Sequence, residues 1–200
     1  GLVFHDVISV RHAKKALEAG VDGLILVCAG AGGHTGVLNP FAFVEEVRRF
    51  WDGPIILSGA ITDGRAVLAA QAAGADLAYV GTRFIATREA NAQEAHKRMI
   101  LEAGADDIVC TDAVTGVRAN YLRASFDAMG IDPDALPAHE KGRLNLAKGG
   151  RDAKAWRDIW GAGQGVGGID DIPSAADCIA RLAREYSAAQ GRLARLPRAA

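Results

Sequence analysis

The sequence predicts an α/β fold built from successive strand–helix units, either part of a (β/α)8 barrel or a doubly wound sheet. Short continuous apolar runs such as Leu24–Val27 and Ile55–Ser58 alternate with segments of helical periodicity. Continuous rather than alternating runs indicate parallel strands that are buried on both faces. A repeated Ala-Gly-X-Asp motif closes helical segments at Ala19–Asp22, Ala73–Asp76 and Ala103–Asp106. The convincing strands number four, which is half of a barrel.

Each element of these units has its own signal in the sequence. The predicted strands are Leu2–His5, Gly23–Val27, Ile55–Ser58 and Leu77–Val80. The predicted helices run over Val10–Ala19, Pro40–Phe50, Arg65–Ala73 and about Thr87–Ala103. Ser9, Asn39 and Asp63 have side chains that cap helix N-termini, and they precede the first three helices. Gly20 and Gly74 end the first and third helices.

The regular alternation stops after residue 103. Residues 104–150 carry proline and glycine breaks, and we predict a helical insertion or lid there, with a weaker strand signal at Ile108–Cys110. Residues 151–200 are predicted to form C-terminal helices that close on the barrel. One of these follows a cap at Asp152, and the last begins at Asp171 to Pro173.

Composition narrows the classes of function. The net charge of −1 offers no basic surface for nucleic acid, and no apolar run reaches membrane-spanning length. The three cysteines lie far apart without a CxxC pair, which argues against a disulfide framework or a zinc site and favours a reducing, cytoplasmic compartment. No signal peptide opens the chain, and a strand is already in progress after Gly1. We therefore expect the chain to be the later part of a longer protein.

Three consecutive strand ends carry the candidate site. Cys28–Gly36 is a glycine-rich loop in which only His34 can exchange a proton near neutral pH. Gly59-Ala60 and Gly81-Thr82 follow the next two strands, where backbone N–H groups and a helix N-terminus can hold a phosphate. These residues predict one pocket that contains a phosphate-binding site and the imidazole of His34. An ordinary strand–helix turn with a solvated histidine is the alternative for the first loop.

Two other features carry less weight. Gly163–Gly168 has the spacing G-x-G-x-x-G, but a tryptophan-containing helix is predicted before it and two aspartates follow it. A dinucleotide-binding loop is therefore not predicted, and a connector that passes close to a ligand is the remaining interpretation. The histidines other than His34 carry little signal, and we expect the side chain of His96 to be solvated.

Taken together, these residues resemble the nitronate monooxygenase family, formerly called 2-nitropropane dioxygenases. The resemblance covers about residues 1–103 and continues more loosely beyond them. The segments that carry it are Gly32–Gly36, Ser58–Gly64, Gly74–Asp76, Val80–Phe84 and, more loosely, Ala162–Gly165.

The resemblance implies the C-terminal half of an FMN-dependent (β/α)8 barrel. Such an enzyme oxidises alkyl nitronates with molecular oxygen, and some members also take nitroalkanes. His34 would act as general base towards a nitroalkane or would stabilise the charge of a nitronate. The implied flavin contacts are Gly32, Gly33, Gly59, Ala60, Val80, Gly81 and Thr82. No metal, nucleic-acid or membrane partner is expected, and a homodimer is a possible assembly.

Three alternatives remain open. A related FMN-dependent reductase of the enoyl-acyl-carrier-protein or quinone type would oxidise NAD(P)H. A non-redox barrel isomerase or lyase would keep the phosphate site without flavin. A non-catalytic remnant with unpaired edge strands would tend to associate.

Overall fold

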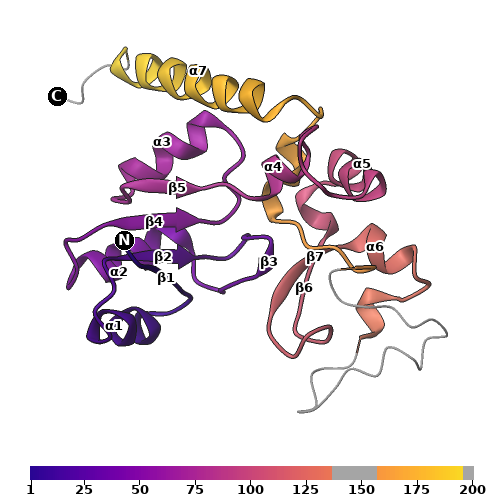
Figure 1. The fold of residues 1–200 in the computed structure, drawn as a ribbon, viewed down its shortest axis with the longest axis horizontal. Helices are drawn as coiled ribbons and strands as arrows, with labels where there is room; N and C mark the ends of the chain where they lie inside the picture. Colours follow the sequence, from indigo (N-terminus) through magenta and orange to yellow (C-terminus); the bar gives the residue numbers. More distant parts are fainter. Residues whose placement is uncertain (137–156, 196–200) are drawn as a thin grey trace.

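The computed structural model describes residues 1–136 and 157–195, and its main sheet has four parallel strands (Figure 1). The strands are β1 (Phe4–Val7), β2 (Gly23–Val27), β4 (Ile55–Ser58) and β5 (Leu77–Tyr79). They lie side by side in the order β1-β2-β4-β5, so each strand of this sheet pairs with the strand of the same sheet that follows it in the sequence. All four predicted strands are therefore confirmed, although β1 begins at Phe4 rather than at Leu2.

The helices between the strands begin where their caps predict. They are α1 (Val10–Glu18), α2 (Pro40–Arg48) and α3 (Gly64–Ala72). The side chains of Ser9, Asn39 and Asp63 each accept a hydrogen bond from a backbone N–H in the first turn. These bonds satisfy donors that the helix itself leaves unpaired, so the predicted starts are confirmed.

The core lies between one face of the sheet and these helices. Leu24, Leu26, Ile55 and Leu57 point to this face and are buried against helix residues such as Phe43. In a doubly wound sheet, helices would cover both faces. Here α1, α2 and α3 contribute to a single core on one face, which is the arrangement of a (β/α)8 barrel seen in part.

The other face of the sheet is less covered than the continuous apolar runs predict. Ile25, Ile56 and Leu77 are in register across β2, β4 and β5 and therefore share this face. The first two are half-buried, whereas Leu77 is 56% exposed and Tyr79 is 55% exposed. The expectation of two buried faces is thus met on the helix side only.

A short helix follows β5 directly, where the sequence predicts a helix only from about Thr87. Helix α4 (Thr82–Ile85) follows its N-cap residue Gly81, and α5 (Glu94–Glu102) begins later than predicted. The Thr87 hydroxyl donates to the Phe84 carbonyl oxygen at 2.8 Å and helps to close the end of α4. The predicted helix therefore corresponds to α5 alone and begins later, and α4 is a helix that the sequence did not predict.

A second sheet replaces part of the predicted helical insertion. It is antiparallel, in the order β3-β7-β6, with β3 (Gly33–His34), β6 (Ile108–Thr111) and β7 (Ala119–Leu122). The prediction of a helical segment is wrong for β6 and β7, because the chain after β6 turns back through Gly116 (φ +79°) and pairs with itself. Helical structure is present around them in η1 (Ala105–Asp107), α6 (Arg123–Asp127) and η2 (Pro133–Ala135). The weaker strand signal at Ile108–Cys110 is confirmed as β6, outside the parallel sheet.

The C-terminal part runs back from β7 to α3. Asp152 lies outside the described residues, and residues 157–161 form a turn and a bridge to Tyr121 rather than a helix. A 3-10 helix, η4 (Gln164–Gly168), leads to α7 (Ala175–Ala194), which is capped by Ser174 rather than started at Asp171. In Figure 1, α7 lies along α3 at the top of the molecule.

An ion-pair cluster ties α7 to the helix after β5. Arg83 is only 3% exposed, and its Nη2 donates to Asp171 Oδ1 at 2.7 Å. Arg181 of α7 donates to the same carboxylate. Hydrogen bonds from Arg181 and then Arg83 hold the pKa of Asp171 below its usual range. Arg83 is therefore a structural residue in this fold.

Candidate functional site

The C-terminal ends of β2, β4 and β5 lie at one edge of the parallel sheet, where sites form in this class of fold (Figure 1). The loop after β2 folds back on the strand it leaves. The Thr35 hydroxyl donates to the Cys28 carbonyl oxygen at 2.9 Å, and the Ala29 N–H donates to the Leu38 carbonyl oxygen at 2.9 Å. Burial raises the pKa of the Cys28 thiol to about 12, so this cysteine is an inert core residue beneath the loop.

The loop after β4 has a conformation that needs glycine. Gly59 has φ +137°, and a Cβ there would lie 2.9 Å from the Ala29 carbonyl oxygen. Ala60 follows with φ +54°, a left-handed conformation that alanine rarely adopts. Such backbone strain is concentrated at functional sites.

Backbone donors border the cavity at the end of β5. Within the described residues, the Gly81 N–H donates to no protein acceptor, whereas the register that pairs Ser58 with Tyr79 directs the Gly59 N–H towards β5. The first N–H groups of a helix also lack intrahelical partners, and α4 begins at Thr82. A Cβ added at Gly81 would meet nothing within 4 Å. These donors therefore border open space.

Gly59 at the end of β4, Gly81 after β5 and the loop after β2 line one cavity of about 350 Å³. The predicted site residues among its lining are Gly32, Gly33, Gly59, Ala60, Gly81 and Thr82. Val80 is not part of this lining; it packs on the core beneath. The other lining residues are mostly small or apolar, including Ala31, Ile61, Ile85 and Trp160.

A further wall comes from the segment that the sequence treats as a connector. The Gly163 N–H donates to Thr82 Oγ1 at 2.9 Å, and the Gln164 N–H donates to the Gly30 carbonyl oxygen at 2.9 Å. A Cβ on Gly32 would come within 2.7 Å of the Gly163 nitrogen. The glycines of this segment allow two backbone stretches, far apart in the sequence, to pack against each other beside the cavity.

His96 and Trp160 complete the wall, and sequence reasoning missed both. Their rings stack with centroids 5.1 Å apart and an interplanar angle of 16°. His96 Nε2 lies 3.2 Å from the Gly161 carbonyl oxygen. The expectation of a solvated His96 is wrong, because the Trp160 segment covers the imidazole. Local sequence held no signal for this contact between residues so far apart in the chain.

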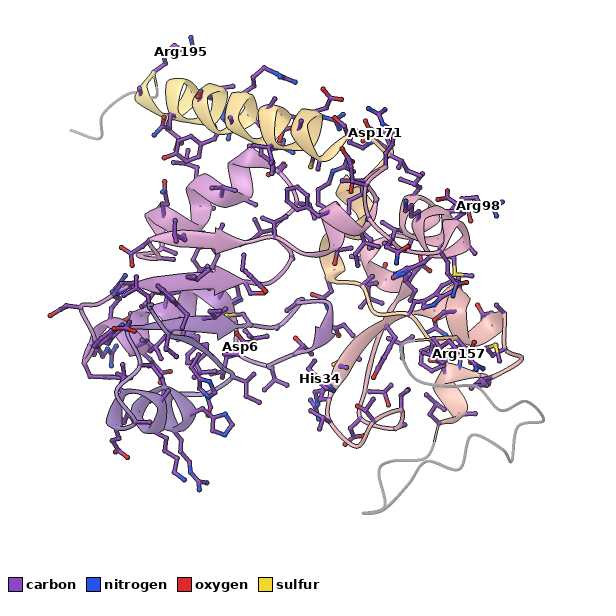
Figure 2. All side chains as sticks on the ribbon, viewed as in Figure 1. Asp6, His34, Arg98, Arg157, Asp171 and Arg195 are labelled. Atoms are coloured by element: carbon purple, nitrogen blue, oxygen red, sulfur yellow. The ribbon has the colours of Figure 1, made fainter. Side chains whose placement is uncertain are left out.

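His34 lies beside the cavity rather than in its lining. Gly33 lines the cavity, whereas the exposed His34 points from β3 towards the β6–β7 hairpin (Figure 2). Its Nε2 is 3.3 Å from Thr115 Oγ1. The structure thus brings the glycines of the predicted site together around one cavity. The imidazole of His34 lies next to Gly33 in the chain but outside the cavity lining.

Other site classes find little support in the described part of the chain. Over residues 1–136 and 157–195, no group of three or more His, Cys, Asp or Glu side chains is arranged to hold a metal ion. Among the helices of these same ranges, none combines the length and the apolar character needed to cross a bilayer.

Comparison with known proteins gives a consistent result. The family model described as nitronate monooxygenase matches residues 2–185. A nitronate monooxygenase of Paraburkholderia phytofirmans is 32% identical over 193 residues, which cover 88% of this chain and 52% of that protein. The chain spans about half the length of the curated relatives that it matches.

Two solved structures resemble the chain over nearly all of its length. FabK from Thermotoga maritima has a TM-score of 0.76 at 28% identity, covering 96% of this chain and 63% of that one. A nitroalkane oxidase from Streptomyces ansochromogenes has a TM-score of 0.77 at 26% identity, covering 96% of this chain and 59% of that one.

Proposed function

Because the chain belongs to the nitronate monooxygenase family, we propose that its cavity binds FMN and serves the oxidation of alkyl nitronates, and of nitroalkanes, by molecular oxygen. The observation that supports this most is the single cavity shared by the Gly59 and Gly81 strand ends and the glycine-rich loop. The likeness to a nitroalkane oxidase supports the same chemistry.

The residues present fit the phosphate end of FMN. A phosphate needs several donors in one place, and the Gly81 N–H borders the cavity without a protein acceptor among the described residues. The start of α4 at Thr82 adds a further donor. Gly81 has open space where any other residue would have a side chain. These residues would hold the phosphate, and Gly32 and Gly33 would lie along the flavin.

Bound FMN supplies the redox chemistry, taking electrons from the substrate and passing them to oxygen. The chain itself binds and orients the cofactor, and the wall from Gly161 to Gly165 helps to exclude water. His34 is our candidate for the proton step. It would take the α-proton of a nitroalkane, or hold the charge of a nitronate, which is already deprotonated.

The proposed oxidation is tested by anaerobic mixing of the full-length protein with an alkyl nitronate and, separately, with NADH. We expect nitronate to bleach the flavin absorbance and air to restore it, while NADH leaves it unchanged. Bleaching by NADH alone would instead assign the chain to the NAD(P)H-dependent reductases. A protein that cannot be reconstituted with FMN would favour the non-redox barrel.

Replacing His34 tests its role. In His34→Asn we expect flavin to stay bound and nitroalkane turnover to fall by about 10²-fold or more, because the base is lost. Nitronate turnover should fall less, since no proton is removed. The control is His12→Gln, at an exposed histidine on α1. Unchanged nitroalkane turnover in His34→Asn would remove His34 from the mechanism.

A further inference from the structure

Among the described residues, the cavity lining has one side chain that can become positively charged. This part of the lining holds no lysine or arginine, and its titratable side chains are His96 and Tyr79. A phosphomonoester brings close to two negative charges into the site at neutral pH. Backbone N–H groups supply partial charges only, so a bound phosphate would need a partner of full charge or would stay incompletely neutralised.

We propose that His96 is this partner: on binding a phosphomonoester, its imidazole takes up a proton from solvent and pairs with the phosphate. The inference rests on the proposed function, since it takes the FMN phosphate as the anion. It makes His96 a binding residue of the same cavity and makes FMN binding proton-coupled.

The hydrogen bond to Gly161 identifies the nitrogen that takes up the proton. A carbonyl oxygen can only accept a hydrogen bond, so His96 Nε2, 3.2 Å from the Gly161 oxygen, carries a hydrogen. The lone pair of the neutral ring is therefore on Nδ1. Protonation adds a donor at Nδ1 and leaves the Gly161 bond and the stack on Trp160 in place.

The surroundings keep the ring neutral until an anion arrives. Burial lowers the pKa of His96, and the Gly161 carbonyl offsets only part of this effect. A phosphate dianion nearby has the opposite effect and raises the pKa. The folded protein thus binds the phosphate more tightly as the pH falls from the bound-state pKa towards the free-state pKa.

Most charged groups around His96 are paired or exposed to solvent. Helix α5 packs on η4 and α6, and η4 carries no charged side chain. The ion pairs on α5 and the neighbouring segments are Lys97 with Glu94, Arg83 with Asp171, Arg157 with Asp158 and Arg123 with Asp134. The side chains of Arg98 and Glu102 on α5 are exposed. Asp127 of α6 faces a separate hollow with Met99 and Glu102. The added anion is therefore the main change in charge that His96 would meet.

The test compares FMN with riboflavin, which lacks the phosphate, as ligands of the full-length apoprotein. Calorimetry in two buffers of different ionisation enthalpy measures proton uptake on binding. For the wild type we expect FMN to bind with proton uptake, and about 3- to 10-fold more tightly at about pH 6.5 than at about pH 8. Riboflavin should bind without uptake and without this pH dependence.

Three variants separate charge from packing. His96→Phe keeps an aromatic ring on Trp160, and His96→Gln keeps a donor for the Gly161 carbonyl. Both should lose the proton uptake and bind FMN about tenfold more weakly, with riboflavin binding unchanged. His96→Arg, with a permanent charge, should keep tight FMN binding and lose its pH dependence. His12→Gln is the matched control.

The outcomes distinguish this inference from the proposed function. If FMN still binds to His96→Phe with wild-type affinity and proton uptake, the inference is wrong while the flavin site stands. If the wild type binds FMN and riboflavin equally well, neither His96 nor the backbone donors hold the phosphate; the inference then fails, and of the proposed function only flavin binding stands. If neither flavin binds, the proposed function and the inference fail together.

Discussion

At the scale of single residues, His34 contacts a residue that sequence reasoning did not identify. The Thr115 hydroxyl donates to the Val117 carbonyl oxygen at 3.0 Å, so towards His34 its oxygen can only accept. His34 Nε2, 3.3 Å away, therefore carries the hydrogen, and the lone pair of the neutral ring is on Nδ1. We therefore expect Thr115 to act as a positioning residue for the proposed base.

Thr115→Val keeps the shape of the side chain and removes this hydrogen bond. We expect kcat/KM for a nitroalkane to fall about tenfold and the pH profile of kcat/KM to change, because the imidazole loses its fixed tautomer. Thr111→Val, in the same hairpin, removes only a local bond to Ala113 and controls for loss of hairpin structure. An unchanged pH profile in Thr115→Val would show that Thr115 has no such role.

At the scale of elements, the sequence predicts what local signals determine. Caps at Ser9, Asn39 and Asp63 locate the helix starts because a cap acts on the turn beside it. In the second sheet, the pairing of β3 with β7 escapes prediction because the two strands are distant in the sequence. Asn120 lies in buried β7 and donates to the Ala31 carbonyl oxygen at 2.7 Å, a contact that no local periodicity reveals.

The same limit applies to the candidate site. Glycine at strand ends can be read from the sequence, since parallel strands bring their ends to one edge. For Gly163–Gly168 the sequence indicates only a connector that passes close to a ligand. The wall that Trp160 to Gly165 form cannot be predicted in detail, because it depends on tertiary packing on Gly30 and Thr82. His96 becomes a site residue only because of that wall.

The packing of α7 on α3 gives a test at this scale. A Cβ on Gly64 would overlap the Leu182 carbonyl oxygen and the Tyr186 nitrogen, so Gly64→Ala should push the helices apart. We expect a loss of about 1 to 3 kcal/mol in the free energy of unfolding, measured by urea denaturation.

Gly191→Ala is the matched control, because Gly191 lies inside α7 with nothing within 4 Å of an added Cβ. This variant should stabilise the protein by about 0.5 to 1 kcal/mol through helix propensity. Equal effects of the two variants would contradict the close approach of α3 and α7.

At the scale of the whole molecule, the arrangement of layers decides the fold class. The core on the helix side, the less covered second face and the strand order that follows the chain together describe part of a (β/α)8 barrel. The chain spans about half the length of its curated relatives, so the activity of the whole protein is a proposal carried by one well-defined cavity. The central claim is that this cavity binds FMN.

The most direct test of this claim is the visible absorbance spectrum of the full-length protein beside that of Gly81→Leu. A Cβ at Gly81 meets no atom within 4 Å and the backbone there is unstrained, so the variant should fold while its side chain fills the phosphate site. We predict a yellow wild type with stoichiometric FMN and a folded, colourless Gly81→Leu. Equal flavin content in the two proteins, or a wild type that cannot take up FMN, would contradict the account.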